Sequence, residues 1–417
     1  APIGTPAFED RTLQAIVAGH QRLLDALVAF SSDSWDFAVQ GANLLLRYCG
    51  SPRLLYWCRL LAPSPSLLAT ARAHDDAKMA AFERISRAGA LPLSARRQVQ
   101  LPIRLGGFGL VSTARVASAA YLGSVAATVG DVWDRFRGHS WMLGTEAALL
   151  ALPWLAQAAS ARTDLLVSIP SAAVPPVSQF IARPHARLQQ RLSEALAKQD
   201  FTVLLESFPV GSRERARLLA CQGPLSSGWL SAIPGQSSGV NRKCLNSFAY
   251  RMATAVTLGL PFPLANLSST CTCGAAIDAL GDHFFLCHQA TAERVFKHNT
   301  LLDVFKSILA EVGIPVVAEV PLRSLGITPP DSDPNSQRMD LFFTVDGEGI
   351  LADVTVRHPC RPDNSTPHHR SVNRTNGRLP GGAVAASGER EKERKYGANC
   401  RQQGYTFIPL AAETFGC

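Results

Sequence analysis

The feature that most constrains the fold is a pair of apolar runs around a Gly-containing turn, "RMDLFFTVDGEGILADVTV" at residues 338–356. Two apolar, β-branched runs on either side of such a turn predict a β-hairpin. Upstream, stretches such as "LQAIVAGHQRLLDALVAF" place apolar residues at helical spacing. A charged helix, "EREKERKYGANCRQQ", and a last strand, "YTFIPLA", follow the hairpin. We therefore expect an α+β chain whose N-terminal two-thirds are mainly α-helical and whose C-terminal end is a small mixed α/β domain.

Changes in sequence texture divide the chain into four segments, residues 1–130, 131–265, 266–290 and 291–417. Hydrophobic residues make up 47% and charged residues 18% of the chain, which excludes a disordered protein. The most apolar stretch, residues 141–160, contains Glu146 and Pro153. We expect it to form a buried helix, and we expect no membrane partner. Ten cysteines in 417 residues are too few for a disulfide scaffold, so we expect reduced thiols in an intracellular compartment.

Three cysteines and a histidine cluster in "CTCGAAIDALGDHFFLC", residues 271–287. Cys271, Cys273, His283 and Cys287 can close a tetrahedral zinc shell, and His288 is an alternative fourth ligand. A closed shell of four ligands has no open coordination position, so the predicted zinc is structural. The alternative interpretation is a set of reduced thiols packed in a core beside a chance histidine.

Two aspartates stand in the predicted hairpin, where an unpaired buried carboxylate would be costly. If Asp346–Gly349 form a four-residue loop, Phe342 faces Asp353 and Asp340 faces Thr355. Both carboxylates then lie on one side as a diagonal pair, about 7–8 Å apart at the backbone, and can hold a divalent cation. A register slip of one residue would separate them. In the alternative interpretation, Asp340 caps the strand and Asp353 faces solvent on an edge strand.

The charged helix after the hairpin offers a cation for the same site. Lys392, Lys395 and Tyr396 stand at i, i+3 and i+4 and therefore share a helix face. A metal-dependent nuclease needs such a cation to offset charge on the phosphate, although a solvated run of charges is the usual interpretation of a stretch like this. The net charge of +8 and the pI near 9.1 suit a polyanionic partner without deciding the function.

Taken in order, these motifs resemble the C-terminal part of site-specific non-LTR retrotransposon polyproteins. The resemblance rests on "C-x-C-G…GDHFFLC", a helix with His298, Glu319 in a strand, "RMD", "ADVTVRHP" and "REKERKYG". Upstream, "LLLRYCGSPRLLYWCRLL" and "QLPIRLGGFGL" look like the thumb region that follows the reverse transcriptase palm. The resemblance implies a thumb-like region at 1–130, a helical linker at 131–265 and a CCHC zinc knuckle at 266–290. Residues 291–417 would form a restriction-like endonuclease domain of the PD-(D/E)xK class.

The family's motif can be carried over residue by residue. Asp340 matches the Asp of the "PD" element, with Met339 where the proline would stand, and Asp353 matches the second acidic residue. Both would bind magnesium. Thr355 occupies the position of the lysine, so that lysine is absent from its strand.

The resemblance implies that the following helix supplies the missing lysine. Lys392 with Tyr396 fits this displaced pattern, and Lys395 is the competing candidate. Glu319 is a weaker match for an auxiliary acidic residue.

Together these motifs imply a DNA endonuclease that uses Mg²⁺ or Mn²⁺ and carries a structural Zn²⁺. It would nick target DNA for target-primed reverse transcription, with element RNA as a second partner, in the nucleus. The Arg-rich loop 361–378 and the knuckle would hold the nucleic acid backbone through salt-sensitive contacts. The rival hypotheses are a zinc-stapled nucleic-acid-binding fragment with a degenerate nuclease site, and a helical scaffold with no nucleic-acid role.

One motif imitates a polymerase site. In "AHDDA", Asp75 and Asp76 look like the paired aspartates of a polymerase palm, but their flanks have helical periodicity and not that of strands. We therefore expect no palm in this chain. If the chain belongs to a longer polyprotein, an upstream palm would be its partner.

Overall fold

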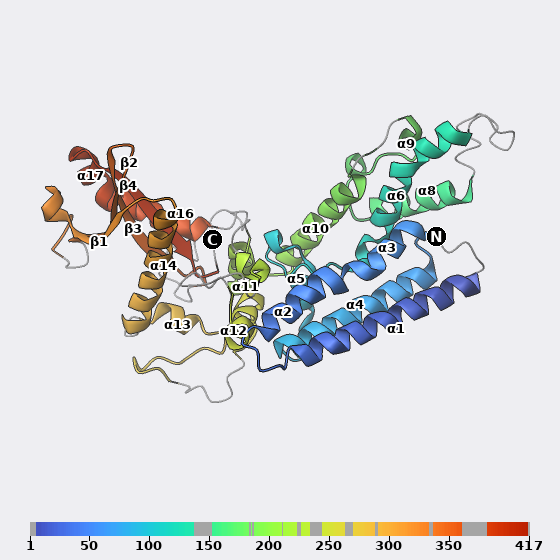
Figure 1. Cartoon of the computed structure of the whole chain (residues 1–417), viewed down its shortest axis with the longest axis horizontal. Helices are drawn as coiled ribbons and strands as arrows, with labels where there is room; N and C mark the ends of the chain where they lie inside the picture. Colours follow the sequence, from blue (N-terminus) through green and yellow to red (C-terminus); the bar gives the residue numbers. More distant parts are fainter. Residues whose placement is uncertain are drawn as a thin grey trace. The chain divides into compact units, whose positions relative to one another are not determined.

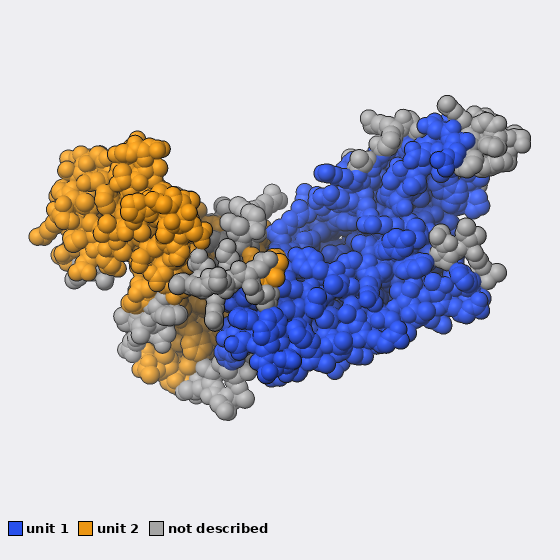
Figure 2. All heavy atoms as spheres, viewed as in Figure 1, with its two compact units in different colours: residues 1–207, 244–254 blue, residues 208–243, 255–417 orange. Residues whose placement is uncertain are grey.

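The computed structural model describes residues 6–136, 152–182, 185, 187–210, 212–222, 227–233, 244–262, 270–287, 291–332, 337–360 and 382–415. Internal contacts divide the chain into two compact units (Figure 2). Unit 1 contains residues 1–207 and 244–254, and unit 2 contains residues 208–243 and 255–417. The four segments expected from the sequence stay a prediction.

Unit 1 is helical throughout its described part (Figure 1). Its elements are α1 (Pro6–Phe30), α2 (Ala38–Leu45), the π-helical turn η1 (Leu46–Gly50), α3 (Pro52–Leu60), α4 (Pro65–Ser86), α5 (Leu93–Gln100), η2 (Ile103–Leu105), α6 (Thr113–Phe136), α8 (Pro153–Leu166), η3 (Ser171–Ala173), α9 (Gln179–Ala182), α10 (Leu188–Glu206) and the first part of α12 (Ser247–Leu258). No helix of the described residues is long and apolar enough to cross a membrane.

The long Ala-rich helix α6 forms the centre of unit 1. One cluster packs its Leu122 and Val129 against α8 and α10, and a second packs its Ala117 and Ala120 against α1, α3 and α4. A Cβ built on Gly123 would lie only 2.8 Å from the backbone nitrogen of Gln189, so glycine lets α6 and α10 approach closely. Alanine and glycine thus allow several helices to pack closely against α6.

A buried ion pair fixes the start of α6. The Asp75 carboxylate accepts hydrogen bonds from the backbone nitrogens of Thr113 (2.8 Å) and Ala114 (3.0 Å) and from the Ser112 hydroxyl (2.7 Å). Lys78, only 2% exposed, lies 2.9 Å from the same carboxylate. Asp75 and Asp76 both lie within helix α4, as their flanking periodicity predicts. Asp75 therefore caps a helix, and the palm interpretation does not apply to it.

Unit 2 combines short helices with one mixed sheet. Its elements are α11 (Arg213–Ala220), η4 (Gly228–Ser231), the rest of α12, α13 (Asp282–Leu286), α14 (Thr291–Glu311), β1 (Val316–Pro321), η5 (Leu322–Leu325), β2 (Arg338–Val345), β3 (Glu348–Arg357), α16 (Ala383–Lys392), the π-helical turn η7 (Glu393–Gly397), α17 (Ala398–Gln402) and β4 (Thr406–Glu413). The α+β class is confirmed, with the helices first and the sheet at the C-terminal end.

The sheet has the strand order β1-β2-β3-β4, and helices pack on both of its faces. β1, β2 and β3 pair antiparallel, whereas β4 runs parallel to β3. On one face, Leu302 of α14 packs on Leu341 and Ala352. On the other face, Tyr396 of η7 packs on Leu351 and Phe407. Both faces of the central strands β2 and β3 are therefore covered, in agreement with their apolar sequences.

The hairpin turn differs from the expected one. Val345 pairs with Glu348 and Phe342 with Leu351, so the loop has two residues, Asp346 and Gly347, and not four. Both have positive φ, 50° and 85°, which is the conformation of a type I′ turn. This turn is favoured because its twist matches that of the two strands. The expected diagonal register is therefore wrong by two residues.

Candidate metal centre and carboxylate site

The four predicted zinc ligands come together in unit 2. The ligand atoms of Cys271, Cys273, His283 and Cys287 all lie within 4.8 Å of one another. The Sγ atoms of Cys271 and Cys287 are 3.7 Å apart, and Cys273 Sγ is 3.5 Å from His283 Nε2. A tetrahedral zinc with the usual bond lengths separates its ligands by about 3.8 Å for S–S and about 3.5 Å for S–N. The cluster can therefore hold a metal ion such as zinc.

The backbone of the knuckle presents these ligands. Gly274, with φ 82°, turns the chain directly after Cys273, and its nitrogen donates to the carbonyl of Cys271 (2.9 Å). The Asp278 carboxylate accepts hydrogen bonds from the backbone nitrogens of Asp282 (3.0 Å) and His283 (2.7 Å), which stabilises the start of α13. Gly281 is needed next to it, because a Cβ there would overlap the ring of Phe262.

A buried polar chain connects the knuckle to the sheet. Oδ1 of Asp282, the residue before the candidate metal ligand His283, lies 3.2 Å from Nε2 of His358, and His358 Nδ1 lies 2.6 Å from the Thr414 hydroxyl. The His358 ring stacks on Phe285 of α13, with ring centroids 4.9 Å apart. His358 follows the end of β3 and Thr414 the end of β4, so the knuckle is attached to the ends of two strands.

Arg213 of α11 extends this chain to a second helix through a bidentate ion pair with Asp282. Burial disfavours the charged form of Asp282, but the hydrogen bonds from His358 and Arg213 outweigh burial and lower the pKa of its carboxyl. Asp282 and His358 stand in the quoted stretches "GDHFFLC" and "ADVTVRHP" but were given no role there, and we did not expect this connection.

The two predicted carboxylates approach each other across the β2–β3 hairpin. Leu341 pairs with Ala352, so Asp340 and Asp353 occupy the next opposed positions. Met339 packs in the cluster on the α16 side and Leu341 in the cluster on the α14 side, although residues two apart on a regular strand share a face. β2 is therefore irregular at Asp340, and the simple expectation of two carboxylates projecting from one regular face is wrong.

Each carboxylate has a cationic partner on a different helix. Lys392 Nζ of α16 lies 2.5 Å from Oδ2 of Asp353, and Nε2 of His298 in α14 lies 3.0 Å from Oδ2 of Asp340. Asp340 also accepts a hydrogen bond from the backbone nitrogen of Val354 (2.6 Å). The structure thus brings together two strands and two helices in a cluster of four charged side chains.

Burial sets the electrostatics of this cluster. Asp353 is 4% exposed, and burial raises the pKa of its carboxyl, with Lys392 opposing and Asp340 reinforcing the shift. Oδ2 of Asp353 is buried, and the neighbouring charged atom is Lys392 Nζ at 2.5 Å. The hydrogen bond to Asp340 raises the pKa of His298 to about 9, so this imidazole is cationic at neutral pH. His298 was part of the motif order but was not assigned to the site.

The remaining predicted site residues lie around this cluster. Lys395 pairs with Asp331 at 3.1 Å, whereas Lys392 pairs with Asp353. Tyr396 is buried, and its ring centroid lies 5.6 Å from Lys392 Nζ. Lys395 Nζ lies 5.3 Å from the same centroid, so Tyr396 packs beside both lysines.

Glu319 is half exposed and pairs with Arg338 at 3.9 Å. Its φ of 57° interrupts the β1–β2 ladder between the pairs Ala318–Leu341 and Val320–Met339, opposite Asp340. Glu319 therefore contributes to the irregular backbone near Asp340, and the contact made by its carboxylate is with Arg338. His288 and the loop 361–378 lie outside the described residues.

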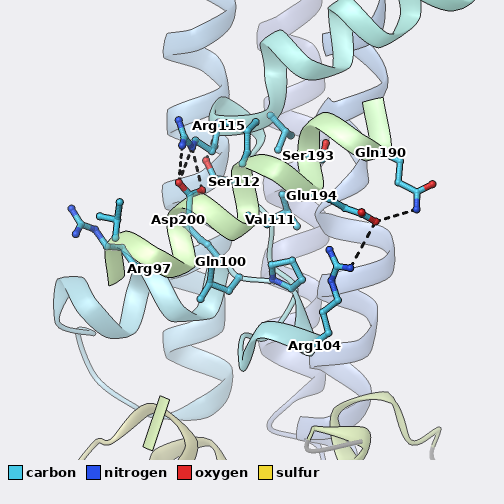
Figure 3. Close-up of a pocket in the computed structure, with 16 residues that line it drawn as sticks. Arg97, Gln100, Arg104, Val111, Ser112, Arg115, Gln190, Ser193, Glu194 and Asp200 are labelled. Carbon is cyan, nitrogen blue, oxygen red and sulfur yellow. Dashed lines mark hydrogen bonds and ion pairs between the residues drawn. The ribbon is translucent and has the colours of Figure 1, made fainter. Parts of the chain in front are cut away.

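Unit 1 contains a separate pocket of about 430 Å³ between α10, the end of α5 and the start of α6 (Figure 3). Four of its charged side chains form two ion pairs. Arg115 forms a bidentate ion pair with Asp200 at 2.7 Å, and Arg104 lies 3.8 Å from Glu194. None of the residues predicted for catalysis or metal binding line this pocket.

No protein-family model matches the chain, and no curated protein matches it in sequence.

Proposed function

We propose that unit 2 carries a metal-dependent DNA endonuclease site formed by Asp340, Asp353 and Lys392. The observation that supports the proposal most is the convergence of these three side chains, which come from β2, β3 and α16, at one place on the sheet. Two carboxylates beside a lysine are the groups needed to bind a divalent cation and to offset charge on a phosphate.

The chemistry of the cluster suits a hard cation. Asp353 Oδ2 is a buried carboxylate oxygen 2.5 Å from Lys392 Nζ, and Mg²⁺ and Mn²⁺ prefer oxygen ligands. Asp340 and Asp353 would hold the ion. When bound, such an ion would lower the pKa of a water and offset charge on the phosphate during hydrolysis.

The protein's own residues have distinct roles in this proposal. Lys392, at 2.5 Å from Asp353, stabilises negative charge that develops on the phosphate. His298 holds Asp340 in place through the 3.0 Å contact. Tyr396 supports the Lys392 side chain from the core.

The wider proposal follows from the motif order. Cys271, Cys273, His283 and Cys287 hold a structural Zn²⁺, and the knuckle and the loop 361–378 contact the backbone of DNA. We further propose that residues 291–417 form a restriction-like PD-(D/E)xK domain of a non-LTR retrotransposon protein. It would nick nuclear target DNA for reverse transcription, with element RNA and an upstream palm as partners.

Nicking of supercoiled plasmid DNA in Mg²⁺ or Mn²⁺ tests this function. Asp353→Asn is expected to abolish nicking while DNA binding persists, because it removes a metal ligand and no phosphate contact. Lys392→Met is expected to slow nicking by about a hundredfold or more. Lys395→Met is the matched control one turn along, and it should change the rate by less than about threefold, in keeping with a surface ion pair. Equal losses in the two lysine variants would contradict the assigned role of Lys392.

One observation favours a second candidate function. Each carboxylate already has a cationic partner, as in a purely structural ion network. A zinc-stapled nucleic-acid-binding protein without catalysis would show this arrangement too. It is the better conclusion if the wild-type chain binds DNA but does not nick it with either metal.

A further inference from the structure

Helix α16 lies along β3 in a fixed register that delivers Lys392 to Asp353. Lys392 contacts Asp353 at one end, and Gly388 lies against Thr355 and Arg357 farther along the strand. Four helical residues advance about 6 Å, and two strand residues advance about 6.6 Å. The spacing along the helix therefore matches the spacing along the strand, and a shift of the helix along the strand would move Lys392 away from Asp353.

Gly388 allows the helix to lie close to the strand. A Cβ built on it would be 3.2 Å from Arg357 Nε and 3.4 Å from Thr355 Cγ2. Thr355 occupies the position where the PD-(D/E)xK motif would have its lysine, so the small residue Gly388 lies against this position. Arg357 adds a second attachment, because its guanidinium donates to the Glu391 carboxylate at 2.8 Å.

The far end of α16 is held by a carboxylate from another strand. Glu413, at the end of β4, is 4% exposed and accepts hydrogen bonds from the backbone nitrogens of Val384 (2.7 Å) and Ala385 (3.1 Å). These nitrogens belong to the first turn of α16, where no helical carbonyl can serve them. In the sheet Glu413 pairs with Arg357 of β3, which itself contacts α16. The carboxylate that caps α16 therefore lies beside this contact.

We propose that Glu413 is a positioning residue of the cleavage site: it fixes the start of α16 over β3 and thereby places Lys392 at Asp353. The catalytic part of this inference rests on the proposed function. The contacts of Glu413 and Lys392 on which it is based do not depend on whether the site cleaves DNA. Because Glu413 acts through a helix of ten residues, it touches neither the metal ligands nor the phosphate.

A double-mutant cycle on unfolding tests the positioning without any activity. Lys392→Met is expected to change the unfolding equilibrium constant of unit 2 in the wild type. In a Glu413→Ala background, the same substitution is expected to change this constant at least about threefold less. Lys395→Met is the matched control, since Lys395 pairs with Asp331, and its effect should add to that of Glu413→Ala. Additive effects for Lys392 as well would overturn the proposal.

Nicking kinetics provide the second measurement. Glu413→Ala is expected to lower the rate at saturating DNA about ten- to a hundredfold, because a small misplacement of a catalytic group is costly, while the DNA concentration at half-saturation stays unchanged. Glu413→Gln keeps an oxygen that accepts the backbone hydrogen bonds and should restore most of the rate. A wild-type rate for Glu413→Ala would overturn the proposal.

The two measurements separate the possible failures. If the wild type does not nick but the cycle shows coupling, the proposed function fails and the positioning stands. If Glu413→Ala does not fold, Glu413→Asp replaces it in both measurements, because its carboxylate is one methylene farther from the helix. If Glu413→Asp shows no coupling to Lys392→Met and leaves the nicking rate unchanged, the role of Glu413 is also refuted.

Discussion

Acid is expected to destabilise unit 1 through a pair of buried histidines. His20 of α1 stacks on His74 of α4, with ring centroids 4.0 Å apart, and His20 is 1% exposed. Burial lowers the pKa of His20 to about 3, and His74, Lys78 and Arg53 act in the same direction, against the opposing charge of Asp75. The folded unit therefore keeps this imidazole neutral at pH values where an unfolded chain protonates it.

The magnitude follows from proton linkage. An unfolded histidine has a pKa of about 6.5, whereas folded His20 binds its proton only near pH 3. Between these values the unfolded state binds more protons, so stability falls as the pH falls. From pH 7 to pH 4.5 the expected loss is about 2.5 kcal/mol. Asp75, whose pKa hydrogen bonds and Lys78 hold below its ordinary value despite burial, adds its own loss only at lower pH.

Urea unfolding with pulsed hydrogen exchange can measure this loss in α1 and α4 separately from unit 2. His20→Phe is the informative variant, because it keeps an aromatic ring against His74 and cannot be protonated. The variant is expected to lose about 2.5 kcal/mol less than the wild type between pH 7 and 4.5. Equal losses in the two proteins would refute the reasoning and would assign the acid sensitivity to other groups.

Two further predictions concern the metal and the nucleic acid. Zinc chelation or Cys273→Ser is expected to increase hydrogen exchange across residues 270–287 and, through Asp282 and His358, at the end of β3, while α1 and α4 keep their protection. Unchanged exchange in the knuckle would argue for thiols packed without a metal. DNA affinity is expected to fall at least about tenfold between about 50 and 200 mM salt if basic side chains contact phosphates. A flat salt response would favour a scaffold with no nucleic-acid role.

Periodicity was sufficient to predict the helical N-terminal part and the order of helix, strand, hairpin, helix and strand in unit 2. It could not determine the length of the hairpin loop, because the residues of Asp346–Gly349 suit both a two-residue and a four-residue turn. The observed loop uses positive φ at Asp346 and Gly347, a backbone conformation that the twist of the paired strands favours. The error of two residues turns the expected diagonal pair, Asp340 and Asp353, into directly opposed positions.

Contacts between elements account for what the sequence pattern could not decide. Lys392 and Lys395 are equivalent by helical spacing, and their partners Asp353 and Asp331 distinguish them. Glu413 could have been found, because a carboxylate at the end of an apolar strand raises the same question that singled out Asp353. The stretch "ADVTVRHP" contains His358 but does not indicate its contact, since its partner Asp282 lies in the knuckle, far away in the sequence.

The energetics of the Asp353–Lys392 pair support a role beyond packing. A buried ion pair contributes little net stability compared with apolar side chains of the same volume, because both charges lose their hydration. Here burial raises the pKa of Asp353, which means that keeping this carboxylate charged costs free energy in the folded state. The surrounding cores are apolar on both faces of the sheet, so apolar residues would suit this position. A costly carboxylate that faces a lysine, and that has a second carboxylate beside it, is the pattern that the proposed cleavage site requires.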